Sequence, residues 1–204
     1  MKARALMITC IALLGGATQV QAEESVPRHW IARVGIHPVN PKPDNHPEYQ
    51  IDNAAGVSLG TTYLFTKHWG LELFGAFPPA NELRTAGGDR AGRFDMRPAS
   101  ATIQYHVTDA SGVFRAYTGA GLGYVSIGGE STKGALAGST LEIGDASGVA
   151  LSLGLDMDLG SKWFANIDAR WLDIDADLRI DGADRGQLAI DPLMFGLSIG
   201  RRLR

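Results

Sequence analysis

A strict alternation of apolar residues with small or charged ones, from about Val113 to Leu203, constrains the fold of this chain most. It is clearest in 146–158, where alternate positions form two sets. The apolar set is Val149, Leu151, Leu153, Leu155 and Met157, and the other set is Gly148, Ala150, Ser152, Gly154, Asp156 and Asp158. Successive side chains of a strand point to opposite faces, so each set occupies one face. This pattern is typical of a transmembrane β-barrel, whereas the polar face of a soluble β-sandwich would carry Lys, Glu and Thr.

The first 22 residues have the features of a cleaved export signal. Lys2 and Arg4 form a basic start, and the apolar segment 5–17 is too short to cross a bilayer. Val20-Gln21-Ala22 resembles a cleavage site, so we expect cleavage after Ala22. The mature chain, 23–204, is then a single outer-membrane barrel domain.

Charge and cysteine content exclude several functions. Without Lys2 and Arg4 the chain carries 17 basic and 22 acidic side chains, a formal charge of −5, which does not favour nucleic-acid binding. Cys10 is the only cysteine and lies in the signal, so we expect no disulfide and no thiolate metal site. No later apolar segment approaches the roughly 18 residues that a membrane helix requires.

The pattern predicts an all-β fold, an eight-stranded antiparallel transmembrane β-barrel. The expected strands are 29–37, 55–66, 68–77, 98–107, 113–125, 146–158, 162–174 and 191–203. Three connections are short turns, and the other four, 38–54, 78–97, 126–145 and 175–190, are long and rich in Gly, Pro, Asp and Asn. Because outer-membrane barrels combine short periplasmic turns with long external loops, both chain ends should be periplasmic.

Aromatic residues on the lipid-facing positions support this register. Those expected at the periplasmic strand ends are Trp30, Phe65, Trp69, Tyr105, Phe114 and Trp163. Those expected toward the external ends are Phe77, Tyr124, Trp171 and Phe195. Aromatic rings form two girdles where a barrel meets the lipid headgroups, so we expect Trp30, Trp69, Trp163 and Trp171 at the lipid interfaces.

The opposite positions define the expected barrel interior. Its ionisable members are Arg33, His37, Glu72, His106, Arg115, Asp156, Asp168 and Arg170. Its apolar members are Ile31, Leu64, Phe74, Val125, Phe164, Leu172 and Met194. Eight strands enclose a space just wide enough for side chains or one slender ligand. Since an unpaired buried charge is costly, we expect Arg33, Glu72, Arg115, Asp168 and Arg170 to form ion pairs or a polar constriction.

Three smaller patterns leave alternatives open. Gly119, Gly121 and Gly123 share an interior row that either curves the strand or clears a path through the barrel. Pro38, Pro78, Pro79, Pro98 and Pro192 either close strands at their external ends or loosen the wall enough for a sideways exit into lipid. Asp173, Asp175 and Asp177 lack the EF-hand spacing, which favours a solvated strand extension over a calcium site.

Four segments together resemble the outer membrane protein W (OmpW) family. They are Trp69-Gly-Leu-Glu-Leu-Phe, Arg115-Ala-Tyr-Thr-Gly-Ala-Gly-Leu-Gly-Tyr, Trp171-Leu-Asp-Ile-Asp and Asp191-Pro-Leu-Met-Phe, and the resemblance extends from Trp30 to Leu203. It implies a narrow, largely apolar lumen and passive uptake of small hydrophobic molecules, as in the related alkane-uptake proteins. The chain departs from the usual barrel ending, since Leu203 stands where an aromatic residue is common and Arg204 follows it.

These observations favour a passive channel for small hydrophobic molecules, lined by the interior residues named above. The alternative is a structural or adhesive barrel whose external loops bind a partner. An enzyme is not expected, because His37 has no serine on its own strand to pair with and His106 lies at the periplasmic end. Expected partners are membrane lipid and lipopolysaccharide, hydrophobic cargo and the barrel assembly machinery. We expect a monomer in the outer membrane of a Gram-negative bacterium, with no metal or other cofactor.

Overall fold

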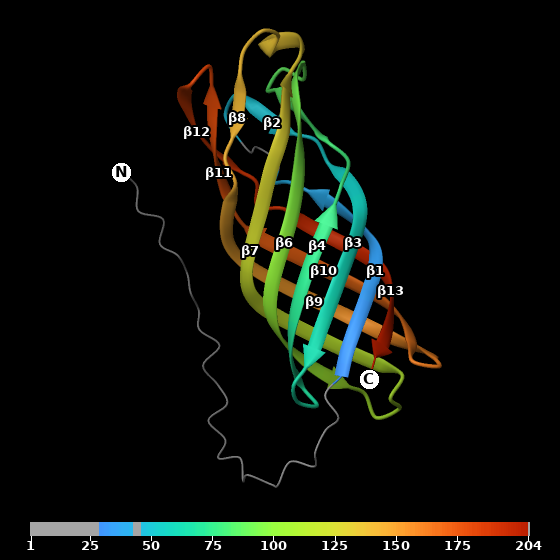
Figure 1. Cartoon of the computed structure of the whole chain (residues 1–204). Coiled ribbons are helices and arrows are strands. Elements are labelled where there is room, and N and C mark those ends of the chain that lie inside the picture. The colour runs from blue at the N-terminus through green and yellow to red at the C-terminus, as the bar shows by residue number, and fades with distance from the viewer. Residues whose placement is uncertain (1–28, 43–45, 204) are drawn as a thin grey trace.

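Eight long strands form the wall of a closed barrel in the computed structural model, which describes residues 29–42 and 46–203 (Figure 1). The strands are β1 (His29–Asn40), β3 (Ala54–Leu64), β4 (Trp69–Phe77), β6 (Arg90–Thr108), β7 (Phe114–Thr132), β9 (Ala146–Gly160), β10 (Trp163–Asp173) and β13 (Leu193–Leu203). The expected signal peptide and Arg204 lie outside the described residues. Within the described ranges, no helix is long and apolar enough to cross a membrane.

Each wall strand pairs antiparallel with its neighbours, and the ring closes on itself. β1 pairs with β3 on one side and with β13 on the other, and the β6–β7 pairing completes the circle. No strand edge of the ring is therefore left open to lipid, which is what a bilayer requires of a sheet. The eight-stranded antiparallel barrel expected from the alternation is confirmed.

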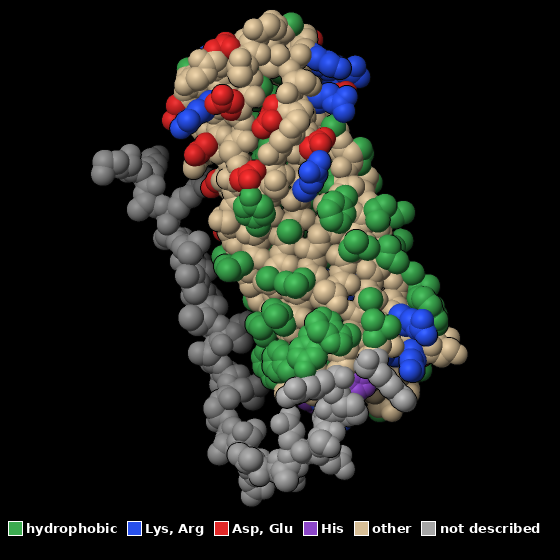
Figure 2. Space-filling view, viewed as in Figure 1, with side chains coloured by type: hydrophobic (Ala, Val, Ile, Leu, Met, Phe, Trp, Pro, Cys, Tyr) green, Lys and Arg blue, Asp and Glu red, His purple; other side chains and the backbone are tan. Residues whose placement is uncertain are grey.

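The wall has the expected apolar outside. Leu122, Leu153 and Leu197 are 73%, 62% and 68% exposed, although a soluble protein would bury such side chains. The residues on either side of Leu153 in β9 and of Leu197 in β13 are buried or half-buried. Figure 2 shows hydrophobic side chains around the barrel wall and charged side chains gathered beyond it at the external end. This division is the one expected of a surface solvated by acyl chains.

Aromatic residues lie on the outer surface at both ends of the wall. Trp30, Trp69 and Trp163 are exposed on the outer surface near the periplasmic turns, and Trp30 packs against Tyr63 with ring centroids 4.9 Å apart. Phe77, Tyr124 and Phe195 are exposed toward the external end. Trp171 has the same outward position in β10 and is half-buried.

The four long connections contain additional strands. They form β2 (Tyr49–Ile51), β5 (Asn81–Thr85), β8 (Leu141–Ile143), β11 (Asp175–Ile180) and β12 (Ala183–Ala189), with a short 3₁₀ helix, η1 (Gly134–Leu136). β2 and β5 extend the edge of β6, while β12, β11 and β8 form a separate three-stranded sheet at the external end (Figure 1). The expected limits 98–107 and 113–125 were therefore too short, because β6 and β7 continue beyond the bilayer as a paired hairpin.

Two details of the sequence interpretation need correction. Pro38 and Pro98 lie inside β1 and β6 rather than at strand ends. The glycine row of β7 does not leave an open path, because neighbouring side chains occupy it. A Cβ on Gly123 would lie 2.7 Å from Leu172 Cδ2, and one on Gly119 would lie 2.7 Å from Ser152 Oγ.

Asp175 and Asp177 are exposed in β11, as expected for a solvated strand extension.

Candidate functional site: the barrel interior

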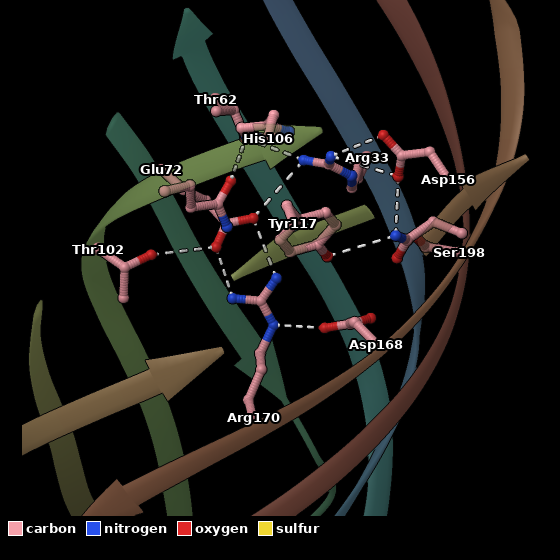
Figure 3. A network of polar contacts seen from close by, with 12 residues as sticks. Arg33, Thr62, Glu72, Thr102, His106, Tyr117, Asp156, Asp168, Arg170 and Ser198 are labelled. Carbon is pink, nitrogen blue, oxygen red and sulfur yellow. Dashed lines mark hydrogen bonds and ion pairs between the residues drawn. The ribbon is translucent and has the colours of Figure 1, made fainter. Parts of the chain in front are cut away.

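A polar network crosses the middle of the barrel, and every wall strand contributes to it (Figure 3). Its members are Arg33 and His37 of β1, Ser58 and Thr62 of β3, Glu72 of β4, Thr102 of β6, Tyr117 of β7, Asp156 of β9, Asn166, Asp168 and Arg170 of β10, and Ser198 of β13. Inward positions alternate along each strand, so the closed ring brings these residues together although they span 166 positions of sequence.

The strongest contacts in the network join Arg170 to two carboxylates. Its Nη1 and Nη2 donate to Glu72 Oε2 and Oε1 at 2.6 and 3.0 Å, and its Nε donates to Asp168 Oδ2 at 2.6 Å. The two bonds to Glu72 form a bidentate fork, which combines charge with fixed geometry. The Glu72 side chain is completely buried, so Arg170 provides most of the compensation for its lost hydration.

Arg33 forms the second half of the network. Its Nη2 donates to Asp156 at 3.2 Å, and its Nη1 donates to Thr62 Oγ1 at 2.9 Å and lies 3.6 Å from Glu72 Oε1. Asn166 also donates to Asp156, at 2.8 Å. Glu72 thus links both arginines, and Arg33, Glu72, Asp168 and Arg170 form the interior ion pairs that the sequence suggested.

His37 joins the network through both ring nitrogens. Nδ1 lies 2.7 Å from Ser58 Oγ, and Nε2 lies 3.0 Å from Asp168 Oδ1. Ser58 was not predicted from the sequence, because it lies on the adjacent strand β3 and not on the strand of His37. The free volume beside the trio is about 10 Å³, roughly enough for one water. No acyl substrate fits there, so we assign this Ser–His–Asp trio to the structural network.

The charges of the network come close to balance. Two arginines face three carboxylates, those of Glu72, Asp156 and Asp168. Near-neutrality is what a barrel interior with little water requires.

Rings from neighbouring strands cover the two arginines. The Phe74 ring centroid lies 3.8 Å from Arg170 Cζ, and the centroids of Tyr117 and Phe164 lie 5.1 and 5.3 Å from Arg33 Cζ. These are cation–π distances. Phe74 also meets the His37 ring edge to face at 4.9 Å. The structure therefore places Phe74 and Phe164 against the network, whereas the sequence suggested only apolar lining.

Glycines make room for these rings. A Cβ on Gly154 would lie 2.3 Å from Tyr117, one on Gly196 would lie 2.0 Å from His37 Nε2, and one on Gly200 would lie 2.1 Å from Phe164. The ring in each case lies directly against a bare backbone. Interior glycine in a strand marks such close approach, so glycines in β9 and β13 were the available signal for the ring positions.

Apolar clusters lie on both sides of the network. Ile31, Leu64 and Phe164 form a small periplasmic cluster. Val125, Leu172 and Met194 belong to a much larger external cluster. This cluster also contains Leu83 of β5, Phe94 of β6, Leu178 of β11 and Leu188 of β12. Phe74 lies at its boundary with the network. The long connections thus pack an apolar core over the barrel mouth.

Of the other predicted interior residues, Arg115 lies outside the network, and His106 lies at its edge beside Tyr117 (Figure 3). Arg115 is half-buried and donates from Nε to Thr108 Oγ1 at 3.2 Å, so the expected ion pair with an interior carboxylate does not form. His106 is buried, with Nε2 3.1 Å from Gln104 Oε1. Both lie near the periplasmic ends of their strands. In the described part of the chain, no cluster of three His, Cys, Asp or Glu side chains could hold a metal ion.

The ladder between β1 and β13 is interrupted near the external end. The register between these strands includes Ile36 with Leu197 and Val39 with Met194, but it skips the two positions between them, His37 and Pro38. Proline lacks the N–H that a ladder bond requires. A lipid-facing groove of about 850 Å³ extends from this seam over β13 and β10 to β9, and its lining includes Pro38, Phe195, Ala169 and Leu153. Only the backbone of Gly196 separates the groove from the His37 ring.

Known proteins resemble this chain in both sequence and fold. Outer membrane protein W of Escherichia coli (strain K12) is 32% identical over 161 residues, 76% of each chain. The dibenzothiophene metabolism operon protein PahQ of Pseudomonas aeruginosa is 29% identical over 157 residues, 74% of this chain and 72% of PahQ. The crystal structure of the outer membrane protein OprG from Pseudomonas aeruginosa superimposes with a TM-score of 0.74 at 21% identity, covering 87% of this chain and 96% of OprG.

A family model gives the identification. The OmpW family model matches residues 16–203, which include all described wall strands. Together with the closed barrel and its apolar outer surface, this match places the protein in the outer membrane of Gram-negative bacteria. The chain belongs to the OmpW family of outer-membrane β-barrel proteins.

Proposed function

We propose that this protein lets small apolar molecules pass from outside the cell into the outer membrane, without energy input. Cargo enters among the external strands, which are β2, β5, β8, β11 and β12. It moves through the external apolar cluster to the level of the polar network and leaves sideways between β1 and β13. The residues expected to line this path are Val125, Leu172, Met194 and Phe74, with His37 at its inner end.

The polar network supports a sideways exit over a straight one. It extends across the barrel and leaves about 10 Å³ beside His37. An apolar molecule continuing toward the periplasm would have to separate the Arg170–Glu72 fork, which leaves two buried charges unpaired. Moving sideways into acyl chains keeps the cargo in apolar surroundings.

The seam is the observation that carries the proposal. It combines skipped ladder pairs, a proline without a donor, a glycine without a side chain and an apolar groove on the lipid side. These features coincide at the level where the external cluster ends. PahQ offers independent support, because its name places it in an operon for dibenzothiophene, a flat apolar heteroaromatic molecule.

A disulfide across the seam tests this path. Pro38 and Phe195 lie in the gap of the β1–β13 register, between the pairs Ile36–Leu197 and Val39–Met194. Continuing the register across the gap puts them opposite each other, where Cα atoms are close enough for a disulfide. The Pro38→Cys/Phe195→Cys variant should take up a small apolar fluorescent probe more slowly when oxidised than when reduced. Comparing the two redox states of one variant removes the effect of the substitutions themselves.

The matched control lies on the same two strands. Ala32 and Arg201 are paired near the periplasmic end, and the Ala32→Cys/Arg201→Cys variant should take up the probe equally in both states. Equal uptake by the oxidised and reduced seam variants would rule out exit at this seam. Uptake lost on Phe74→Asp with the barrel assembled would still indicate an interior path.

A loop-binding barrel is the second candidate. The observation in its favour is the filled interior, with a large apolar core beneath the external strands. It predicts that cells with and without the protein take up the probe at the same rate. Contact with membrane lipid follows from the fold, while a monomeric state and delivery by the barrel assembly machinery remain part of our proposal.

A further inference from the structure

We propose a binding site for one anionic glycolipid of the outer leaflet, such as lipopolysaccharide, on the outer face of β6. The site has an acyl-chain groove within the membrane zone and a row of cationic side chains directly beyond it on the same strand. It is separate from the β1–β13 seam and does not depend on the proposed transport function.

The groove exists because β6 carries small residues on its outer face. Ala101 lies between Leu73 of β4 and Leu122 of β7, and Ala99 follows it toward the external end, opposite Tyr124. Leu73 and Leu122 are 54% and 73% exposed and form the two sides. The resulting apolar groove has a volume of about 360 Å³, which suits acyl-chain segments.

Cationic side chains continue along β6 immediately outside the groove. Arg97, Arg93 and Arg90 are exposed, and Lys133 lies beside them, with its N–H donating to the Ala91 carbonyl oxygen at 2.9 Å. The span from Arg97 to Arg90 covers roughly 23 Å at the rise of an antiparallel strand. Figure 2 shows Lys and Arg side chains at the external end, beyond the hydrophobic wall.

Two of these four cations lack a fixed partner. Arg97 pairs with Asp95 at 3.1 Å, and Arg90 pairs with Glu82 at 3.3 Å. Across the described ranges, Arg93 and Lys133 form no ion pair, and together with Arg90 they border a second hollow of about 240 Å³. Exposed ion pairs are weak, so a phosphate can also compete for Arg97.

Position and charge together identify the occupant. Tyr124 belongs to the external aromatic girdle, which marks the headgroup level, and Arg97 lies two residues beyond its partner Ala99. A lipid with chains along Ala101 and Ala99 therefore places its phosphates at Arg97 and its further anionic sugar groups toward Arg93 and Lys133. A neutral lipid would use the groove but leave Arg93 and Lys133 without an ionic partner.

The test measures binding of purified lipopolysaccharide to the intact barrel in detergent by native mass spectrometry. The wild-type protein should retain one lipid, and Arg93→Glu/Arg97→Glu should weaken retention at least tenfold. The matched control is Arg179→Glu/Arg185→Glu, which reverses two exposed arginines of β11 and β12 and should leave binding unchanged. Equal weakening by both double variants would overturn the proposal.

A second variant tests the groove separately from the charges. Ala101→Phe fills the groove without changing the net charge, so it should weaken binding of lipopolysaccharide several-fold. Deacylated lipopolysaccharide should bind more weakly than the intact lipid and should not respond to Ala101→Phe. If the deacylated form binds as well as the intact lipid, the surface is a general anion-binding surface and the lipid site is refuted.

Discussion

The interior charges are the residues on which the barrel depends most. Among the residues that the structure describes, Glu72 is the only carboxylate that contacts both Arg33 and Arg170, and no part of its side chain reaches solvent. Removing one partner of a buried ion pair is costly because the other charge stays buried without compensation. Exposed pairs such as Arg90–Glu82 contribute much less.

Glu72→Gln should therefore lower the free energy of unfolding by about 3–5 kcal/mol. The glutamine preserves the shape of the side chain, so the loss reports charge. Urea titration of the barrel in lipid vesicles, followed by tryptophan fluorescence, measures it. Glu82→Gln is the control and should cost less than about 1 kcal/mol. Similar values for both variants would contradict a dominant role of the network.

Gly154 should not tolerate even a methyl group. An added Cβ would lie 2.3 Å from the Tyr117 ring, which itself covers Arg33. Gly154→Ala should lower stability by about 1–3 kcal/mol through overpacking. Gly75→Ala is the control, since its Cβ would have ordinary contacts no closer than 3.6 Å. The same urea titration compares the two, and a neutral Gly154→Ala would show that Tyr117 can move aside.

At the scale of elements, a polar clamp at Asp145 holds the external part of β7. Asp145 connects β7 to the segment between β8 and β9, because its carboxylate accepts the Ile127 N–H at 2.7 Å and the Tyr124 hydroxyl at 2.5 Å. The Ile127 N–H, and after it the Tyr124 hydroxyl, hold the pKa of Asp145 below its ordinary value of 3.8. These bonds favour the ionised form.

The Asp145 clamp should therefore weaken in acid. A carboxyl whose folded-state pKa is lowered stabilises the fold fully above its unfolded pKa, and the contribution is lost as pH falls through the folded value. Hydrogen-exchange protection of the Ile127 amide should be high at pH 7 and decrease below about pH 4. In Asp145→Asn, protection should be lower at pH 7 and independent of pH. Constant protection in the wild-type protein would contradict the clamp.

At the scale of the whole molecule, three layers divide the barrel interior. A small apolar cluster lies toward the periplasm, the polar network crosses the centre, and the large apolar cluster lies beneath the external strands. The network crosses the centre and leaves about 10 Å³ beside His37, so we expect it to restrict the passage of ions and water. Such a barrel should conduct few ions, in contrast to wide porins whose lumen holds water.

The double variant Glu72→Ala/Arg170→Ala should open this layer. It removes one negative and one positive side chain, so the charge of the network is unchanged while its central fork is lost. Single-channel recording in planar bilayers should show higher conductance than for the wild-type barrel. Glu82→Ala/Arg90→Ala removes an exposed pair and should leave conductance unchanged. Wild-type conductance in the first variant would place the barrier in an apolar cluster instead.

The sequence by itself determined the barrel, its strand order and the direction of nearly every wall side chain. Period-two alternation is a local property of the backbone, so Leu153 on the outside and Asp156 on the inside could be assigned without knowing any neighbour. Girdle residues such as Trp69 and Trp163 followed from the same rule. Strand limits were less certain, because β6 and β7 keep pairing beyond the membrane, where lipid no longer enforces an apolar face.

Only the tertiary structure decided which interior residues meet. The Ser58–His37 contact depends on register between strands, and the Arg170–Glu72 fork joins residues 98 positions apart on strands that are not neighbours. The seam at Pro38 likewise requires knowing that its unpaired side faces β13. Alternation along one strand carries no information about the height of the next strand, since register is set only when the ring closes and every interior charge finds its partner.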